Sequence, residues 1–442
     1  MIPGECITSN TAVADRLFEA RRHRERLNDV AIIAVTGSCG KTTTKDLVAA
    51  VLATRFKGSK SEDTRNCGLD VATTVLAACP DDDFLVQELG AWGPGTLDAG
   101  ISLVRPDIAV ITNLRNDHYS SFRGPQGAQA EKGKLVASLP STGAAVLNWD
   151  DPLVRELSSY TSASTLSFGR ASDAALRAWN VRARWPERLS FSVSYGPQTA
   201  HIHTRLLGEH LLSSALAALG VGILLGMTLD TAAAALASAE PTFRRMSPVS
   251  HADGVTFIRD DWKAPIDSLL EALSFMKSAV ARRKIAIVGR ISDFPGRSRH
   301  IYERVAREAI TGLDGVVFVG ERAAQLWGEH KSMSAASQAK IRQRLVVASH
   351  DLHEVPFELE DGKLGNMFVF NTVRDADAFL QGYLTAGDLV LVKGSGPADH
   401  LERLILVREQ EVKCWVGACG RLNPCDVCEL VRAPRAGEGG EA

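Results

Sequence analysis

Residues Val35 to Asp46 read VTGSCGKTTTKD, and this stretch decides the fold of the first half of the chain. The run that overlaps its start, VAIIAVTG, is apolar and β-branched, and the run that overlaps its end, KDLVAAVLATRF, has helical spacing. This order predicts a strand, a glycine-rich loop and a helix. A loop at such a junction can direct backbone N–H groups and a helix N-terminus at phosphate groups.

The loop residues are suited to a nucleoside triphosphate. We expect Lys41 to contact the terminal phosphates and Thr42 to hold Mg²⁺. Val35 stands where the standard pattern has its first glycine, so the loop reads Gly-x-x-Gly-Lys-Thr. The alternative is a tight turn whose glycines serve only geometry. The residues expected to bind the nucleotide here are Gly37, Ser38, Gly40, Lys41, Thr42 and Thr43.

Further strand-like runs indicate two α/β domains. DFLVQELG, DIAVITNL and GAAVLNWD follow the loop, and helix-compatible segments separate them, which is typical of a parallel sheet covered on both faces. A second series, GVTFIRDD, KIAIVGR, GVVFVG, MFVFNT and DLVLVKGS, begins near Arg244 and includes helical segments such as IYERVAREAI. We predict a central ATP-binding domain at residues 31–243 and a Rossmann-like domain at 244–408.

The ends of the chain are predicted to carry separate segments. Residues 1–30 are expected to form a lead-in, because Thr11 to Leu27 have helical spacing. Residues 409–442 are expected to form a Cys-rich tail whose end, RAPRAGEGGEA, is disordered. The residues expected on the apolar face of the lead-in helix are Ala14, Leu17, Phe18, Ala20 and Leu27.

Composition describes an ordinary globular protein of two or three domains. The 442 residues are 45% hydrophobic and 23% charged, with a net charge of −2, which does not suggest a nucleic-acid partner. The apolar stretch from Leu211 to Met227 is interrupted by Ser and Gly and is shorter than the ~20 residues of a membrane span. We expect it to be a buried core helix. With no secretory signal evident, we expect a cytoplasmic location, where the eight cysteines serve as thiols or metal ligands.

A series of short motifs resembles the Mur ligase family of ATP-dependent amide ligases, and within it the branch that adds D-alanyl-D-alanine. The motifs, in order from about Asp15 to about Arg403, are TGSCGKTT, ELGAWGPGTL, DIAVITNLRNDH, AEKGKL, AVLNWDDP, GEH, RR, DDWKA, IAIVG and VLVKGS. The resemblance implies a P-loop ATPase domain followed by a Rossmann-like ligase domain. It also implies ATP and Mg²⁺ as cofactors.

The resemblance implies a set of magnesium ligands. Glu88 ends a strand-like run, where a carboxylate can bind Mg²⁺ directly or through water. His118 corresponds to a histidine that helps to bind a second Mg²⁺, and Lys132 to a lysine that many members carbamylate, which turns the cation into an anion. Lys134 is a rival for this position. The expected magnesium set is therefore Thr42, Glu88, His118 and Lys132.

The resemblance also assigns contacts to ATP and the substrates. Arg245 corresponds to the arginine that reaches the γ-phosphate, and Lys263 to the lysine that faces the acyl phosphate. Asp261 corresponds to the aspartate that holds the ribose, with Asp260 as the adjacent alternative. Other implied nucleotide contacts are Asn113 and His210, whereas Leu211 and Ser214 replace asparagines that often contact adenine. Lys393 and Ser395 are candidates to bind the incoming amine.

Two features depart from the family pattern. Members that act on UDP-linked muramyl peptides begin with a domain of ~80 or more residues, and only about 30 residues precede the phosphate-loop strand here. We therefore expect an acid without a UDP handle, such as a small molecule, a peptide or a carrier-bound acyl group, or a partner protein that supplies the missing platform. The tail adds four thiols that can enclose Zn²⁺, although unligated thiols and an iron–sulfur cluster stay open. These thiols are Cys414, Cys419, Cys425 and Cys428.

Three functions are compatible with this sequence. The first is a ligase that forms an amide from an acid and an amine or amino acid through an acyl phosphate, releasing ADP and phosphate. The second is a nucleotide-binding scaffold or partner subunit with a degenerate site. The third is a folylpolyglutamate-type ligase, although DDWKA and ELGAWGPG resemble the Mur branch more. We expect the first.

Overall fold

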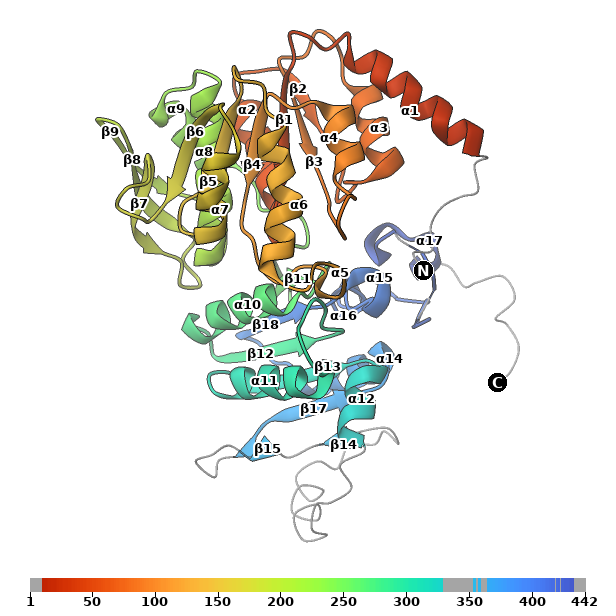
Figure 1. Ribbon diagram of the computed structural model, residues 1–442. Coiled ribbons are helices and arrows are strands. Elements are labelled where there is room, and N and C mark those ends of the chain that lie inside the picture. The colour runs from red at the N-terminus through yellow and green to blue at the C-terminus, as the bar shows by residue number, and fades with distance from the viewer. Residues whose placement is uncertain are drawn as a thin grey trace. The chain divides into compact units, whose positions relative to one another are not determined.

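The computed structural model describes residues 10–328, 353–354, 357–358, 364–417, 419–421 and 423–432. The chain divides between Thr242 and Phe243 into two compact units. Figure 1 colours the first, here called the central unit, red to green and the second, the C-terminal unit, green to blue. The residue limits predicted for a lead-in segment and a Cys-rich tail stay a proposal.

The central unit contains a nine-stranded sheet in the order β2-β3-β1-β4-β5-β6-β7-β8-β9. The strands from β2 to β7 are parallel, and β8 and β9 continue the sheet as an antiparallel meander. The strands are β1 (Ala31–Thr36), β2 (Gly58–Lys60), β3 (Phe84–Glu88), β4 (Ile108–Ile111), β5 (Ala144–Asn148), β6 (Ser164–Gly169), β7 (Leu176–Arg182), β8 (Ser190–Tyr195) and β9 (Gln198–His203).

Helices cover both faces of this sheet. Side chains alternate along β1, so Ile32 and Ala34 join the core under α1, α3, α4 and α6. On the other side, α2 and α8 pack against each other, and α8 also packs on β5 and β6. The helices are α1 (Asn10–Arg24), α2 (Lys41–Leu52), α3 (Gly68–Ala77), α4 (Asp98–Val104), α5 (Tyr119–Phe122), α6 (Pro125–Ala137), α7 (Pro152–Glu156), η1 (Leu157–Tyr160), η2 (Glu209–Leu211), α8 (Leu212–Leu224) and α9 (Leu229–Ser238).

Two helix predictions have different outcomes. The apolar stretch after Leu211 is a buried core helix, α8, as predicted. The lead-in helix exists as α1, but Phe18 is 60% exposed and Ala14 is also exposed, so the prediction that these two share the buried face is wrong. Ala20 is buried as predicted, and the buried side also includes Arg24, whose guanidinium donates to the carbonyl oxygens of Val104 (2.6 Å) and Arg105 (2.8 Å).

The C-terminal unit contains a second sheet, in the order β10-β11-β18-β12-β13-β17-β14. Its five inner strands are parallel, and β10 and β14 close the edges antiparallel. The strands are β10 (Ser247–Ser250), β11 (Thr256–Asp260), β12 (Arg283–Val288), β13 (Gly315–Val319), β14 (His353–Glu354), β17 (Met367–Phe370) and β18 (Asp388–Lys393), and β15 (Phe357–Glu358) pairs with β16 (Leu364–Gly365).

The helices of this unit follow its parallel strands. They are α10 (Ile266–Ser278), α11 (Ser298–Ile310), α12 (Glu321–Gly328), α14 (Val373–Tyr383), α15 (Gly396–Asp399), α16 (Arg403–Leu406), η3 (Cys425–Val427) and α17 (Glu429–Arg432). The predicted α/β fold with two parallel sheets is confirmed. The predicted disorder of the last residues, from Arg432 on, falls almost wholly outside the described residues. Among those that are described, no helix combines the length and apolarity needed to cross a membrane.

Candidate nucleotide site

Three chain segments meet at the carboxyl edge of the central sheet. β1 lies between β3 and β4 and runs parallel to both. The chain forms β2 and β3 on one side of β1 and then β4 on the other, which makes this edge a topological switch point, where open α/β sheets bind ligands. The glycine-rich loop follows β1, Glu88 ends β3 and Thr112 follows β4.

The loop after β1 can be built only with glycine at two positions. Gly37 has φ +149°, and a Cβ at this residue would lie 1.9 Å from Oγ1 of Thr112. Gly40 has φ +81° and stands directly before α2, in the left-handed region that side chains disfavour. The two glycines therefore let the backbone turn tightly onto the helix N-terminus.

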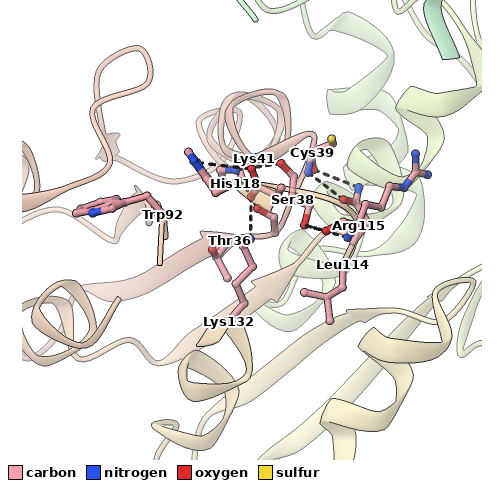
Figure 2. Close-up of polar contacts among 12 residues, drawn as sticks. Thr36, Ser38, Cys39, Lys41, Trp92, Leu114, Arg115, His118 and Lys132 are labelled. Carbon is pink, nitrogen blue, oxygen red and sulfur yellow. Dashed lines mark hydrogen bonds and ion pairs between the residues drawn. The ribbon is translucent and has the colours of Figure 1, made fainter. Parts of the chain in front are cut away.

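The segment after β4 holds this loop in shape, and Figure 2 shows Arg115 of this segment beside Ser38 of the loop. Asn113 accepts a hydrogen bond from the backbone N–H of Cys39 at its Oδ1 (2.9 Å) and donates from Nδ2 to the Cys39 carbonyl (3.2 Å). Oγ1 of Thr112 donates to the same carbonyl (2.6 Å), and the N–H of Ser38 donates to the Asn113 carbonyl (2.9 Å). Asn113 thus positions the loop, and the nucleotide contact expected of it stays a prediction.

Lys41 brings positive charge to the loop. Its Nζ donates to the carbonyl oxygens of Gly37 (2.8 Å) and Ser38 (3.2 Å), so the ammonium lies against the loop backbone. Thr42, on the first turn of α2, is half-buried, and Thr43 is buried. An ammonium beside the N-terminus of a 12-residue helix is an arrangement that favours phosphate.

Glu88 offers a buried carboxylate beside this loop. It pairs in register with Val35 of β1 and is 1% exposed. Asn66 donates to Oε1 (2.7 Å), whereas Oε2 is buried and accepts no hydrogen bond. Burying such an oxygen costs free energy unless a partner satisfies it. A divalent cation fits this need, and carboxylate oxygen is a ligand that Mg²⁺ prefers.

Lys132 is fully buried and points toward the part of the site where Lys41 and His118 lie (Figure 2). Its Nζ donates to Oδ2 of Asp117 (2.8 Å) and lies 5.1 Å from the centroid of the Phe122 ring. Nε2 of His118 lies 3.6 Å from Oδ1 of the same carboxylate. Asp117 therefore links the two residues that the resemblance implicated, and the sequence analysis did not identify it.

The charges of this cluster shift one another. Burial opposes ionisation of Asp117, but the positive side chains around it, first Lys41 and then Lys132, outweigh burial and lower the pKa of its carboxyl. Burial also lowers the pKa of the Lys132 ammonium, and Asp117 offsets this only in part. Lys134, the rival lysine, is on the exposed side of α6, where it pairs with Asp98 and Glu131. Of the two lysines, only Lys132 faces this cluster.

The GEH segment lies at the start of α8. His210 is half-buried in η2. Leu211 is buried, and Oγ of Ser214 accepts a hydrogen bond from Oγ1 of Thr44 in α2 (2.9 Å). Ser214 therefore serves the packing of α8 against the loop helix, which explains how a residue other than asparagine is accommodated there.

In the C-terminal unit, Asp261 forms ion pairs with two arginines. It is 1% exposed, Oδ1 lies 3.2 Å from Nε of Arg244, and Oδ2 accepts from Nη2 of Arg259 (3.0 Å). Arg244 is itself buried, whereas its neighbour Arg245 is half-buried and Lys263 is exposed. The ribose contact proposed for Asp261 requires this ion-pair network to open.

The proposed amine-binding residues lie after β18. Nζ of Lys393 donates to Oδ2 of Asp260 at 2.5 Å, and both side chains are buried. Ser395 is half-buried and precedes α15, where its N–H donates to Oδ2 of Asp399 (2.6 Å). Burial raises the pKa of Asp399 to about 6 despite this hydrogen bond. Ser395 is therefore more accessible to a ligand than Lys393.

The four tail thiols, which the sequence offered as one possible zinc set, lie in different surroundings. Cys425 lies beside His400 and Glu402, and the possible ligand atoms of these three residues are within 4.8 Å of one another. Among the described residues, none of the other three tail thiols belongs to such a group of three or more metal-binding side chains. Cys414 instead packs with Leu406 and other apolar residues. Burial lowers the pKa of His400 to about 4 and raises that of Cys425 to about 12.

A glycine-rich loop at the switch point of a parallel sheet, with a lysine and a buried carboxylate beside it, defines a P-loop nucleotide-binding α/β protein. Comparison with known proteins narrows this class. Residues 35–222 match the Mur ligase middle domain, and residues 244–396 match the glutamate ligase domain of Mur ligases. The chain belongs to the Mur ligase family, whose members are ATP-dependent amide ligases that use Mg²⁺.

Individual relatives agree with this assignment. A protein of Mycobacterium tuberculosis (strain CDC 1551 / Oshkosh) named UDP-N-acetylmuramoyl-tripeptide--D-alanyl-D-alanine ligase is 29% identical over 381 residues, which are 84% of this chain and 71% of the relative. MurF from Acinetobacter baumannii has a similar fold, with a TM-score of 0.74 at 21% identity over 90% of this chain and 81% of that one. The structure of MurF ligase from Thermotoga maritima in complex with ADP is similar with a TM-score of 0.71 at 20% identity. The match covers 92% of this chain and 87% of that one.

Proposed function

We propose that this chain activates a carboxylic acid with ATP and joins it to an amine through an acyl phosphate. The carboxylate attacks the γ-phosphorus, the bond from that phosphorus to the bridging oxygen breaks, and ADP leaves. The amine then attacks the acyl carbon, loses a proton and displaces inorganic phosphate. The observation that supports this most is the lysine-bearing loop at the switch point, beside a buried Glu88 oxygen that accepts no hydrogen bond.

The side chains divide the work of phosphoryl transfer. Lys41 holds the terminal phosphates, and Arg245 and Lys263 add positive charge as negative charge grows on the transferred group. Mg²⁺, when bound, neutralises part of the phosphate charge. The residues proposed to organise it are Thr42, Glu88, His118 and Lys132.

Lys132 is proposed to carry a carbamate in the active protein. The side chain is fully buried, and its carboxylate partner Asp117 also faces His118. Carbamylation replaces the buried cation with an anion that can share a metal ion with this cluster. A mass increase of one CO₂ on the α6 peptide under native conditions, absent from Lys132→Ala, tests this modification.

We propose that the acid substrate carries no uridine diphosphate group. The described residues before β1 form one helix that packs on α3 and α4 of the central unit. The names of the relatives supply the alternative, a UDP-N-acetylmuramoyl-tripeptide joined to D-alanyl-D-alanine.

One experiment tests the reaction and the acid together. The protein is incubated with ATP, Mg²⁺, an amine pool that includes D-alanyl-D-alanine, and either UDP-N-acetylmuramoyl-tripeptide or a pool of acids without UDP. We expect phosphate release that depends on both acid and amine, with a new amide from the second acid pool. Lys41→Ala should lower the rate at least about 100-fold. Lys57→Ala, an exposed lysine paired with Asp82, is the matched control.

The outcomes separate the hypotheses. An amide formed only from the UDP-linked acid would overturn the substrate proposal and leave the reaction intact. Tight binding of ATP without turnover in any mixture would favour a nucleotide-binding scaffold.

A further inference from the structure

A second group of reactive side chains lies where the tail packs against the corner between α15 and α16. Nδ1 of His400 lies 3.5 Å from Sγ of Cys425, and Nε2 of the same ring lies 3.5 Å from Sγ of Cys419. A carboxylate oxygen of Glu402 lies within 4.8 Å of the His400 and Cys425 ligand atoms. His400, Glu402 and Cys425 are at most 3% exposed.

The spacing of these atoms fits a tetrahedral ion. With a metal–nitrogen bond of about 2.0–2.1 Å and a metal–sulfur bond of about 2.3 Å, two ligands at the tetrahedral angle lie about 3.6 Å apart. The 3.5 Å between Nδ1 of His400 and Sγ of Cys425 matches this separation. A hydrogen bond between a thiol and an imidazole has a similar length. The surrounding contacts must therefore distinguish a pair of metal ligands from a hydrogen bond.

Those contacts orient both side chains as ligands. Nε2 of His400 faces Cys419, and a proton on Nε2 leaves the Nδ1 lone pair free to bind a metal. Arg403 donates from Nε to Sγ of Cys425 (3.2 Å) and from Nη1 to the carbonyl of Val416 (2.9 Å). Burial and Glu402 raise the pKa of the Cys425 thiol to about 12 in the metal-free chain, and Arg403 offsets part of this rise. The guanidinium therefore lies where it can stabilise the thiolate that forms when a metal displaces the thiol proton.

The Glu402 carboxylate has one buried oxygen without a hydrogen bond, which is a separate reason to expect a cation here. Its Oε1 accepts the backbone N–H of Cys425 (3.0 Å). Oε2 is buried and accepts no hydrogen bond, although it lies 3.2 Å from Nη2 of Arg244. The ion pair with Arg244 is therefore poorly oriented, and a fully buried oxygen is left with unused acceptor capacity. A cation beside His400 and Cys425 would use it.

We propose that His400 Nδ1, Cys425 Sγ and the Glu402 carboxylate bind one Zn²⁺-type ion, with the fourth position open to Cys428 or water. The mixed nitrogen, sulfur and oxygen set selects a borderline metal over Mg²⁺. On binding, the Cys425 thiol loses its proton to solvent and the thiolate takes the metal. The ion ties the tail to the α15–α16 corner, and it lies close to Arg244, the neighbour of Arg245. This site differs from four tail thiolates, because His400 and Glu402 take the places of two of them.

Metal content tests the site directly. Protein expressed with added zinc and purified without chelators should contain about one zinc per chain by mass spectrometry of the elements. Cys425→Ser and His400→Gln should each lower the content at least tenfold. Cys79→Ser, which changes a half-buried thiol of the central unit, should leave it unchanged.

A second measurement covers variants that fail to fold. Wild-type protein stripped of metal and titrated with Co²⁺ should show the visible bands of a tetrahedral site and a sulfur-to-cobalt charge-transfer band. The intensity of the charge-transfer band in wild type and in Cys428→Ser shows whether one or two thiolates bind the ion. Absence of both zinc and these bands would overturn the proposal. Zinc that survives His400→Gln but is lost in Cys414→Ser would overturn it in favour of a four-thiolate site. Neither readout depends on ligase activity.

Discussion

Lys132 and Lys134 stand two positions apart on α6 and lie in opposite environments, one fully buried and the other exposed. Positions two apart on a helix point in directions about 160° apart, so only one could face the site. The sequence supplied both candidates but could not tell which face of α6 is buried. Asp117 was missed, although an acidic residue directly before His118 in a loop after a strand is a signal that could have identified it.

In protein whose Lys132 is not carbamylated, Asp117→Asn should destabilise the central unit, because it leaves the buried Lys132 ammonium without a counter-ion. We expect the free energy of unfolding to fall by about 3 kcal/mol, the usual cost of breaking a buried pair. Urea denaturation measures this change. Lys134→Ala, which removes the ion pairs of a partly exposed lysine with Asp98 and Glu131, should cost clearly less, because solvent screens the Lys134 charge. Equal effects of the two substitutions would contradict the buried-pair interpretation.

At the scale of the element, continuous apolar runs such as KIAIVGR predicted β1, β3, β4 and β5 of the central sheet and the five parallel strands of the other sheet, but not β2 or β6. The meander of β7, β8 and β9 was not predicted, although FSVS in β8 alternates Phe191 and Val193 inward, a pattern visible in the sequence. Phe18 was placed on the wrong face because apolarity alone does not fix which side of an amphipathic helix packs. The buried side of α1 includes Arg24, whose hydrogen bonds to Val104 and Arg105 come from a distant segment.

Gly37→Ala should damage the phosphate loop, because its Cβ would collide with the Thr112 side chain and the backbone has positive φ. We expect ATP affinity to fall at least about tenfold and stability to fall by about 1–3 kcal/mol. Gly382→Ala, in the open helical environment of α14, should instead stabilise the protein by about 0.5–1 kcal/mol. Calorimetry of ATP binding and of unfolding measures both, and unchanged affinity in Gly37→Ala would contradict the loop geometry.

Asp377 in α14 gives a pH dependence with a defined sign. Burial raises the pKa of its carboxyl, against a hydrogen bond from Gln381. A raised acid pKa means that the folded state keeps the proton longer than the unfolded state, so its contribution to stability is full below about 3.8 and is lost as pH rises through the raised value. Asp377→Asn should therefore gain stability over wild type at neutral pH, and the gain should vanish near pH 3. A gain that persists at low pH would contradict this assignment.

At the scale of the molecule, the tail is part of the C-terminal unit through contacts that no local pattern announces. Arg259 of β11 donates to both oxygens of Asp426 (2.6 and 3.0 Å), a residue 167 positions away. Although burial opposes the charge, Asp426 and Asp261 raise the pKa of Arg259. The sequence could show four tail cysteines and a series of strand-like runs. It could not show that Asp426, which stands between Cys425 and Cys428, pairs with the buried Arg259.

Asp426→Ala should destabilise the C-terminal unit by about 3 kcal/mol, because Arg259 is left buried with one fewer carboxylate. Glu308→Ala removes a partly exposed pair with Lys277 and should cost less than about 1 kcal/mol. Thermal unfolding of both variants provides the comparison. An Asp426→Ala variant as stable as Glu308→Ala would show that the tail does not anchor this unit.

The path of one oxygen atom tests the central claim most directly. An acid substrate labelled with oxygen-18 in its carboxyl group is converted to amide with ATP and Mg²⁺, and the released phosphate is analysed by mass spectrometry. An acyl-phosphate ligase transfers one labelled oxygen to phosphate for each amide formed, with ADP as the nucleotide product. Unlabelled phosphate, or AMP and pyrophosphate as products, would contradict the account.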